Sequence, residues 1–474
     1  MDILIIFIAL GLLMYTAYKG HSVIIFAPLC ALLAVAFIAP SQILPFYSNI
    51  FMVKMVEFVK NYFPVFLLGA IFGKLVEMSG VAESIANTII KLIGEKRTML
   101  SIVLLCAILT YSGVSLFVVS FAVYPFAKKL FMVADIPKRL IPATITLGAI
   151  SFTMDALPGT PQIQNVIPTT YFGTTLYAAP VLGLIGSVYV LVVGMLYLEN
   201  RARKYKAQGE GYFDSEKSEA ERTAFEQFKQ EELLEEESTM RKVMAFAPLV
   251  LVGVSNKLFT TFIPKWYPTG FDFGDIGLAQ FGVIEIQTVL GVWSVILALL
   301  LGIIATILYN PSILSDIKEG VNSSVGGALL ASMNTGSEYG FGGVIAALPG
   351  FAIIQTGLGN TFSNPLANAA VSTNVLAGIT GSASGGMSIA LSAMGDKFIL
   401  MANEANIPLP VVHRVVSMAS GGMDTLPHNG AIITLLSVTG LTHKQAYKDI
   451  FGITLLKTTG VIVVIGVYYL TGWV

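Results

Sequence analysis

The stretch Met154-Asp155-Ala156-Leu157-Pro158 decides the fold, because it returns later in the chain as Met423-Asp424-Thr425-Leu426-Pro427. The offset is 423 − 154 = 269 residues. Neighbouring residues keep nearly the same offset: Thr110 matches Thr380, Lys128 matches Lys397, and Ile136-Pro137 matches Ile407-Pro408. Matches along one diagonal indicate an internal repeat. We therefore expect a first copy over residues 1–198 and a second over 243–474, joined by a hydrophilic loop over 199–242.

The composition favours a membrane over water as the solvent. The chain has 474 residues, of which 55% are hydrophobic and 12% are charged, whereas soluble domains carry about 25% charged residues. A net charge of -1 argues against a nucleic-acid partner. Cys30 and Cys106 lie in apolar runs, and the four histidines form no H-x-x-x-H pair. We therefore expect no disulfide framework, no metal and no cofactor.

Several hydrophobic windows are long enough for a helical span, which takes about 20 residues. They lie near residues 2–19, 22–39, 58–78, 174–198, 243–263, 286–309, 326–348 and 451–472. Residues 98–131 and 366–402 are too long for one crossing and too short for two, which predicts two re-entrant hairpins. Residues 139–172 and 411–439 contain polar breaks with proline, which predicts two broken helices. The predicted fold is an all-α polytopic membrane protein, an inverted-repeat secondary transporter with about ten transmembrane helices.

Basic residues orient the predicted spans. They flank the 199–242 loop, so the positive-inside rule places this loop in the cytoplasm and both termini outside. Few basic residues, among them Lys54, Lys265 and Arg414, then fall on the outer side of the inner membrane. An odd number of spans, five, separates corresponding elements, so the second copy is inverted relative to the first. The hairpins then enter from opposite sides, and their tips meet near mid-membrane.

The hairpin tips and helix breaks form the expected binding site. Half-helix N-termini expose unpaired N–H groups that suit a small anion such as a carboxylate. The predicted substrate contacts are Thr110, Tyr111, Ser112, Gly113, Thr160, Thr380, Ser382, Ser384, Gly385, His428 and Asn429. Gln162 and Asn165 are weaker candidates. The alternative is structural: the hydroxyls bond to their own helices, and the glycines serve close helix packing.

Four ionisable residues at membrane depth are the candidates for proton coupling: Asp155, Asp424, Glu338 and His428. The two aspartates sit in the breaks, where each can equally cap the following helix. Glu338 belongs to a polar insertion, Asn334-Thr335-Gly336-Ser337-Glu338, that we expect to interrupt its span, either at the proton path or in an outer vestibule. His428 has no repeat counterpart, and it is either a titrating group or a satisfied core histidine.

The run Thr380 to Met387, the stretch from Met423 to Ala431 and the order of spans resemble the GntP gluconate:proton symporter family, within the larger ion transporter superfamily. The resemblance covers nearly the whole chain except the 199–242 loop. It implies a mobile transport domain formed by the hairpins and broken helices, a separate scaffold domain, a homodimer and elevator-type alternating access.

The first break departs from the gluconate-transporting members, which carry a His- and Pro-rich stretch there. This chain has Met154 to Pro161 instead, closer to members that carry short hydroxy acids such as 3-hydroxybutyrate. The expected activity is proton-coupled symport of a hydroxy monocarboxylate. Sodium coupling is the alternative within transport, since tip carbonyls and hydroxyls can bind sodium. An intramembrane hydrolase using Ser384 is the alternative from another class, and it leaves the repeat unexplained.

Overall fold

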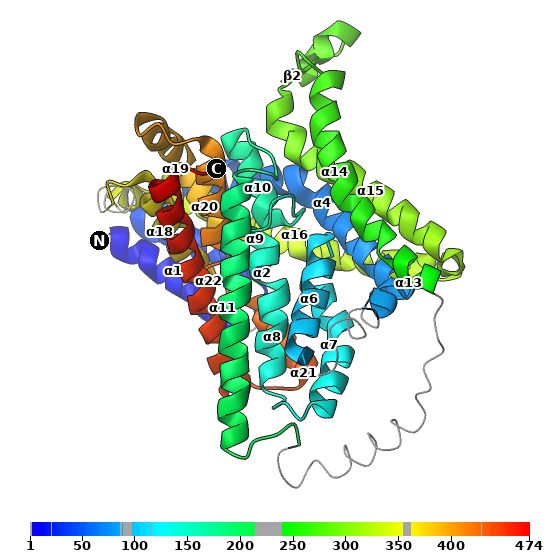
Figure 1. Ribbon diagram of the computed structural model, residues 1–474. Helices are drawn as coiled ribbons and strands as arrows, with labels where there is room; N and C mark the ends of the chain where they lie inside the picture. The colour runs from blue at the N-terminus through cyan, green and yellow to red at the C-terminus, as the bar shows by residue number, and fades with distance from the viewer. Residues whose placement is uncertain are drawn as a thin grey trace.

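The computed structural model describes residues 2–19, 21–85, 88, 97–114, 116–213, 239–353, 362–427 and 429–474. Helices dominate these residues (Figure 1). The all-α prediction needs a small correction, because β1 (Phe271–Asp272) pairs antiparallel with β2 (Val283–Ile284). This short ribbon lies in the connection between two long helices and leaves the helical architecture unchanged.

The helices of the first half are α1 (Asp2–Tyr18), α2 (Val23–Ile38), α3 (Ile43–Phe46), α4 (Met52–Met78), α6 (Thr98–Tyr111), α7 (Leu116–Val133), α8 (Leu140–Ala149), α9 (Phe152–Asp155), α10 (Ile163–Phe172) and α11 (Pro180–Ala207). The 3-10 turn η1 (Pro40–Gln42) and the π turn η2 (Tyr47–Phe51) lead into α4.

The helices of the second half are α13 (Thr239–Ala245), α14 (Ala247–Trp266), α15 (Ile286–Tyr309), α16 (Ile317–Ala347), α18 (Pro365–Thr380), α19 (Ala383–Glu404), α20 (Leu409–Ser420), α21 (Gly430–Thr439) and α22 (His443–Thr471). Short 3-10 turns η4 (Phe273–Ile276), η5 (Ala279–Phe281) and η6 (Pro311–Ser315) lie in the connections.

Within the described residues, five helical stretches are long and apolar enough to cross a membrane by length and composition. They are Pro40–Met78, Pro180–Ala207, Ala247–Trp266, Thr288–Tyr309 and His443–Thr471. Shorter apolar helices include Val23–Ile38 and Thr98–Tyr111. The total of ten spans stays a prediction.

The predicted hairpins are helix–turn–helix units. Gly113 (φ +95°) lies in the turn between α6 and α7, and Gly381 (φ +66°) lies in the turn between α18 and α19. Both residues adopt left-handed backbone conformations that a side chain disfavours. Ser382 then caps α19 by accepting from Gly385 N at 3.1 Å. The re-entry of these units into a membrane stays a prediction.

The first residues of the hydrophilic segment are helical, because α11 continues to Ala207, where its polar end packs against α22. One expectation about a polar segment is wrong. The insertion at 334–338 does not interrupt a span, because α16 runs continuously from Ile317 to Ala347. Ser337 satisfies its hydroxyl by donating to Met333 O within the helix, and Gly336 allows α4 to approach closely.

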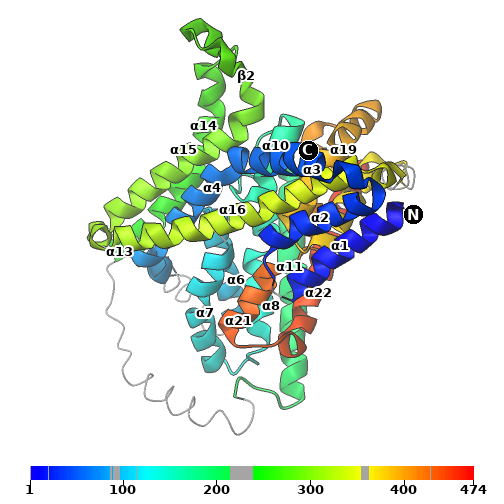
Figure 2. The ribbon, with the colours of Figure 1, turned by 180° about the vertical axis from the view of Figure 1, so that it is seen from behind.

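Equivalent helices of the two halves run antiparallel. The start of α11 meets the end of α22, where Val181 N donates to Val474 O at 3.3 Å, and the end of α11 meets the start of α22, where Arg201 pairs with Asp449 at 2.5 Å (Figure 1). In the same way, the start of α16 lies on the end of α4. Figure 2 shows α16 crossing the molecule beside α2 and α4.

Candidate functional site

The two helix breaks lie against each other. Asp155, at the end of α9, is 4% exposed, and its carboxylate faces Gly421, where a Cβ atom would overlap it. The backbone oxygen of Asp155 accepts from the Ser417 hydroxyl at 2.7 Å and from Arg414 at 3.0 Å, both on α20. The second broken helix therefore holds the break of the first in place.

A buried ion pair forms the second connection between the breaks. Lys457 of α22 pairs with the carboxylate of Asp424, and both side chains are 3% exposed. The same ammonium donates to Ile150 O in the first break at 3.0 Å. Sequence reasoning missed Lys457, although it is the single charged residue in the window 451–472. A lone charge within an apolar span was the available signal.

Arg414, which the topology count places on the outer side, lies inside the protein. It is fully buried, and its guanidinium donates to the backbone oxygens of Ala178 and Leu176 in addition to Asp155. The preceding His413 contacts Asn165 of α10 at 3.1 Å. The bonds of Arg414 satisfy backbone oxygens at the end of α9 and in the connection between α10 and α11, as buried polar groups require.

Each hairpin tip is bonded to a helix break by one amide side chain. Gln162, directly before α10, donates to Thr110 O at 2.6 Å and to Val114 O at 3.1 Å in the first tip. Asn429, directly before α21, donates to Gly381 O at 2.7 Å in the second tip, and it accepts from Ile432 N at 2.9 Å. The residue that corresponds to Asn429 in position and role is Gln162, although the offset of 269 residues places Thr160 opposite Asn429.

Most of the predicted tip hydroxyls bond to backbone. Ser112 donates to Ile108 O at 2.6 Å, Thr380 donates to Leu376 O at 3.0 Å, and the Tyr111 hydroxyl donates to Pro158 O at 2.9 Å. For these residues the geometry favours the structural alternative. Ser384 lies near Ser382, with 3.5 Å between their hydroxyl oxygens.

Two threonines differ from these hydroxyls. Thr110 and Thr160 are fully buried, and within the described residues their hydroxyl oxygens have no hydrogen-bond partner. Buried polar atoms are normally paired with protein or water. These two hydroxyls, one in the first tip and one in the first break, therefore keep unused hydrogen-bonding capacity in the described part of the chain.

Glu338 reaches the second tip from α16. Its side chain is 8% exposed, and its carboxylate lies against Gly385 in the first turn of α19. Its Oε2 atom lacks a hydrogen-bond partner in the described part of the chain. His428, the remaining candidate, lies outside the described residues.

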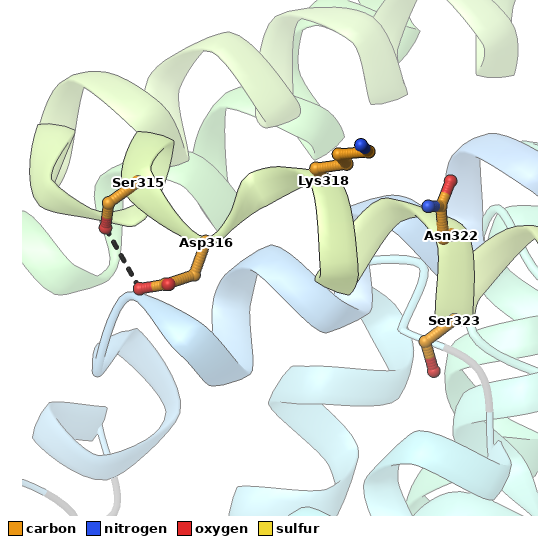
Figure 3. Close-up of a pocket in the computed structure, with 5 residues that line it drawn as sticks. All are labelled: Ser315, Asp316, Lys318, Asn322 and Ser323. Carbon is orange, nitrogen blue, oxygen red and sulfur yellow. Dashed lines mark hydrogen bonds between the residues drawn. The ribbon is translucent and has the colours of Figure 1, made fainter.

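No group of three His, Cys, Asp or Glu side chains in the described ranges is arranged to hold a metal ion. A surface hollow of about 500 Å³ lies elsewhere, at the start of α16 (Figure 3). Its lining is Ser315, Asp316, Lys318, Asn322 and Ser323. None of the predicted site residues lines this hollow, so it adds nothing to the site between the breaks.

Residues 3–420 match the sequence profile of the GntP family permeases. The chain belongs to the GntP permease family. A relative with 62% identity, covering all of both chains, is the Bacillus subtilis (strain 168) protein named uncharacterized transporter YxjC. Family and relative together indicate a membrane-embedded secondary transporter rather than an enzyme.

Two solved transporter structures resemble the fold of this GntP family permease. The YdaH transporter of Alcanivorax borkumensis aligns with a TM-score of 0.54 at 14% identity, covering 89% of this chain and 88% of that one. MtrF of Neisseria gonorrhoeae, from a class of antimetabolite efflux pumps, aligns with a TM-score of 0.50 at 12% identity, covering 88% and 83%. At these identities the likeness concerns the fold alone.

Proposed function

We propose that this GntP family permease carries a small hydroxy monocarboxylate, 3-hydroxybutyrate or gluconate in kind, in symport with protons across the inner membrane. The main support for this proposal is the contact between the two broken helices around Asp155, Asp424 and Lys457. Ionisable groups buried at membrane depth mark substrate and proton paths. The unpaired hydroxyls of Thr110 and Thr160 add hydrogen-bonding capacity for a hydroxylated anion.

The proposed transport cycle is of the elevator type. The antiparallel pairs α4 with α16 and α11 with α22 support an inverted repeat over 1–198 and 243–474. The hairpins and broken helices would form the moving part, and α1, α2, α4, α14, α15 and α16 the scaffold of a homodimer. The loop within 199–242 would be cytoplasmic, with both termini outside.

Uptake into proteoliposomes tests the proposal. Labelled 3-hydroxybutyrate and gluconate are offered with an imposed pH gradient, acidic on the side of entry, and with sodium replaced by choline. We expect accumulation that follows the pH gradient and persists in choline. Uptake of both acids that ignores the gradient would falsify proton coupling, and loss of uptake in choline would support the sodium-coupled alternative.

Asp424→Asn separates coupling from architecture. If Asp424 carries the proton, the variant loses uphill uptake but keeps substrate exchange, which needs no net proton movement. Asp449→Asn is the matched control, because Asp449 is also a buried aspartate paired with a cation but lies at the far ends of α11 and α22. Equal loss of uphill uptake and exchange in Asp424→Asn would assign Asp424 a structural role with Lys457.

A further inference from the structure

The two hairpin tips are contacted by scaffold helices at equivalent positions. On α4, Gly69 lies against the first tip, where a Cβ atom would sit 3.2 Å from Gly113 O. On α16, Glu338 lies against Gly385 of the second tip. The separation of these two scaffold residues is 338 − 69 = 269, the same offset that relates Asp155 to Asp424. The repeat thus places no side chain at one tip and a carboxylate at the other.

Glu338 lies at the N-terminus of α19, and none of the described lysine, arginine or histidine side chains forms an ion pair with it. The carboxylate lies against Gly385 in the first turn of α19, where the helix dipole favours negative charge, while the Gly385 N–H group itself donates to Ser382 Oγ at 3.1 Å. The Ser382 hydroxyl interacts with it. The charged groups on the facing stretch of α4 are Lys54 and Glu57, which pair with each other at 2.9 Å, and Lys60, which is exposed. The hydroxyl of Tyr339, the residue after Glu338, bonds to the Tyr171 hydroxyl at 2.5 Å.

A buried carboxylate with an unpaired oxygen is unfavourable unless a hydrogen-bond donor or a cation lies beside that oxygen. The N-terminus of α19 is also where an anionic substrate would be expected to bind. Two carboxylates cannot both be ionised at one helix end, because the like charges repel in a low-dielectric site. An ionised Glu338 and an ionised substrate carboxylate at this helix end would therefore exclude each other.

We propose that Glu338 is an internal carboxylate ligand that occupies the α19 N-terminus in the empty transporter and must take up a proton before a substrate carboxylate binds there. The proposal rests on the proposed function for the nature of the substrate. One proton is bound by Glu338 for each substrate carboxylate admitted, so the residue links the two stoichiometrically. The glycine at the equivalent place on α4 restricts this link to the second tip.

An experiment without substrate tests whether Glu338 occupies the α19 N-terminus in the empty transporter. Ser384→Cys places a thiol at the tip, in a background where the buried Cys30 and Cys106 are replaced by alanine. Labelling by a methanethiosulfonate reagent is compared with and without Glu338→Gln. At about pH 8, where a glutamate is ordinarily ionised, we expect Glu338→Gln to speed labelling about tenfold, the scale of one charged hydrogen bond. Near about pH 4, around the ordinary pKa of a glutamate, the difference between the two rates should become smaller.

Glu57→Gln on α4 is the matched control, because it also removes a scaffold glutamate but leaves the tip untouched. It should label at the unmodified rate, and monodisperse elution of each variant verifies folding. Equal labelling rates with and without Glu338→Gln at both pH values overturn the proposal.

A binding experiment then tests the link to substrate, with 3-hydroxybutyrate and gluconate as probes. In the unmodified transporter, affinity should rise as the pH falls, and Glu338→Gln should bind with little pH dependence. Unchanged pH dependence in Glu338→Gln overturns the competition. If neither acid binds any variant, the proposed substrate class fails, while the labelling rates still decide the role of Glu338.

Discussion

Replacing Lys457 with methionine tests the buried ion pair that joins the two breaks. The ammonium pairs with Asp424 and donates to Ile150 O at 3.0 Å, with its side chain 3% exposed. Methionine keeps most of the volume, so the packing change is small. Removing one partner of a buried pair destabilises a protein by about 3–5 kcal/mol, because the other charge is left buried and unpaired.

Thermal unfolding in detergent measures this loss. An unfolding entropy of about 2 cal/mol/K per residue amounts to about 1 kcal/mol/K for this chain, so a loss of about 4 kcal/mol lowers Tm by about 4 °C. The matched variant combines Lys457→Met with Asp424→Leu, which removes both charges and should recover most of the lost stability. If single and double variants unfold at the same temperature, the ion pair is not the source of the loss and the reasoning is refuted.

Three further substitutions test other contacts. Asn429→Ala removes the bond to Gly381 O and the cap of α21, so we expect a loss of about 1–2 kcal/mol and weaker substrate binding; unchanged binding would contradict a role in placing the tip. Gly421→Ala forces a methyl group against the Asp155 carboxylate and should destabilise by about 1–3 kcal/mol, seen as a lower Tm, whereas an unchanged Tm would mean that the breaks are not in close contact. Asp449→Asn should lower stability by about 1.5–3 kcal/mol in the same unfolding assay but leave uptake per folded molecule intact, and lost uptake would show that the ends of α11 and α22 take part in transport.

Local sequence signals predicted the elements with small errors. The predicted hairpin 98–131 corresponds to α6 and α7, which end at Val133, and the predicted broken helix 411–439 corresponds to α20 and α21. The helices follow these ranges because the apolar runs and the small polar residues that interrupt them are features of neighbouring residues, while re-entry into a membrane stays a prediction. The polar insertion at 334–338 was wrongly predicted to interrupt a helix, because local composition alone suggested a break. The segment is helical and packs against α4.

The sequence pointed to the two helix breaks but not to the bonds between them, and the binding role of these residues stays a prediction. Asp155 and Asp424 were identified from the repeat, and the structure places both in the contact between the breaks. Lys457 is 33 residues from Asp424 in sequence, and no local pattern pairs the two residues. Gln162 was ranked below Thr160, because the offset alone cannot show which side chain reaches the tip.

The sequence by itself determined the membrane class and the family and predicted a repeat, because these depend on composition and on the order of residues along the chain. Tertiary structure alone decided which buried charges are neutralised: Lys457 pairs with Asp424, while Glu338 meets the N-terminus of α19 without a cation beside it. The reason is that the energy of a buried charge depends on groups within a few ångströms. Those groups come from helices that are distant in sequence and that meet only when the two halves pack together.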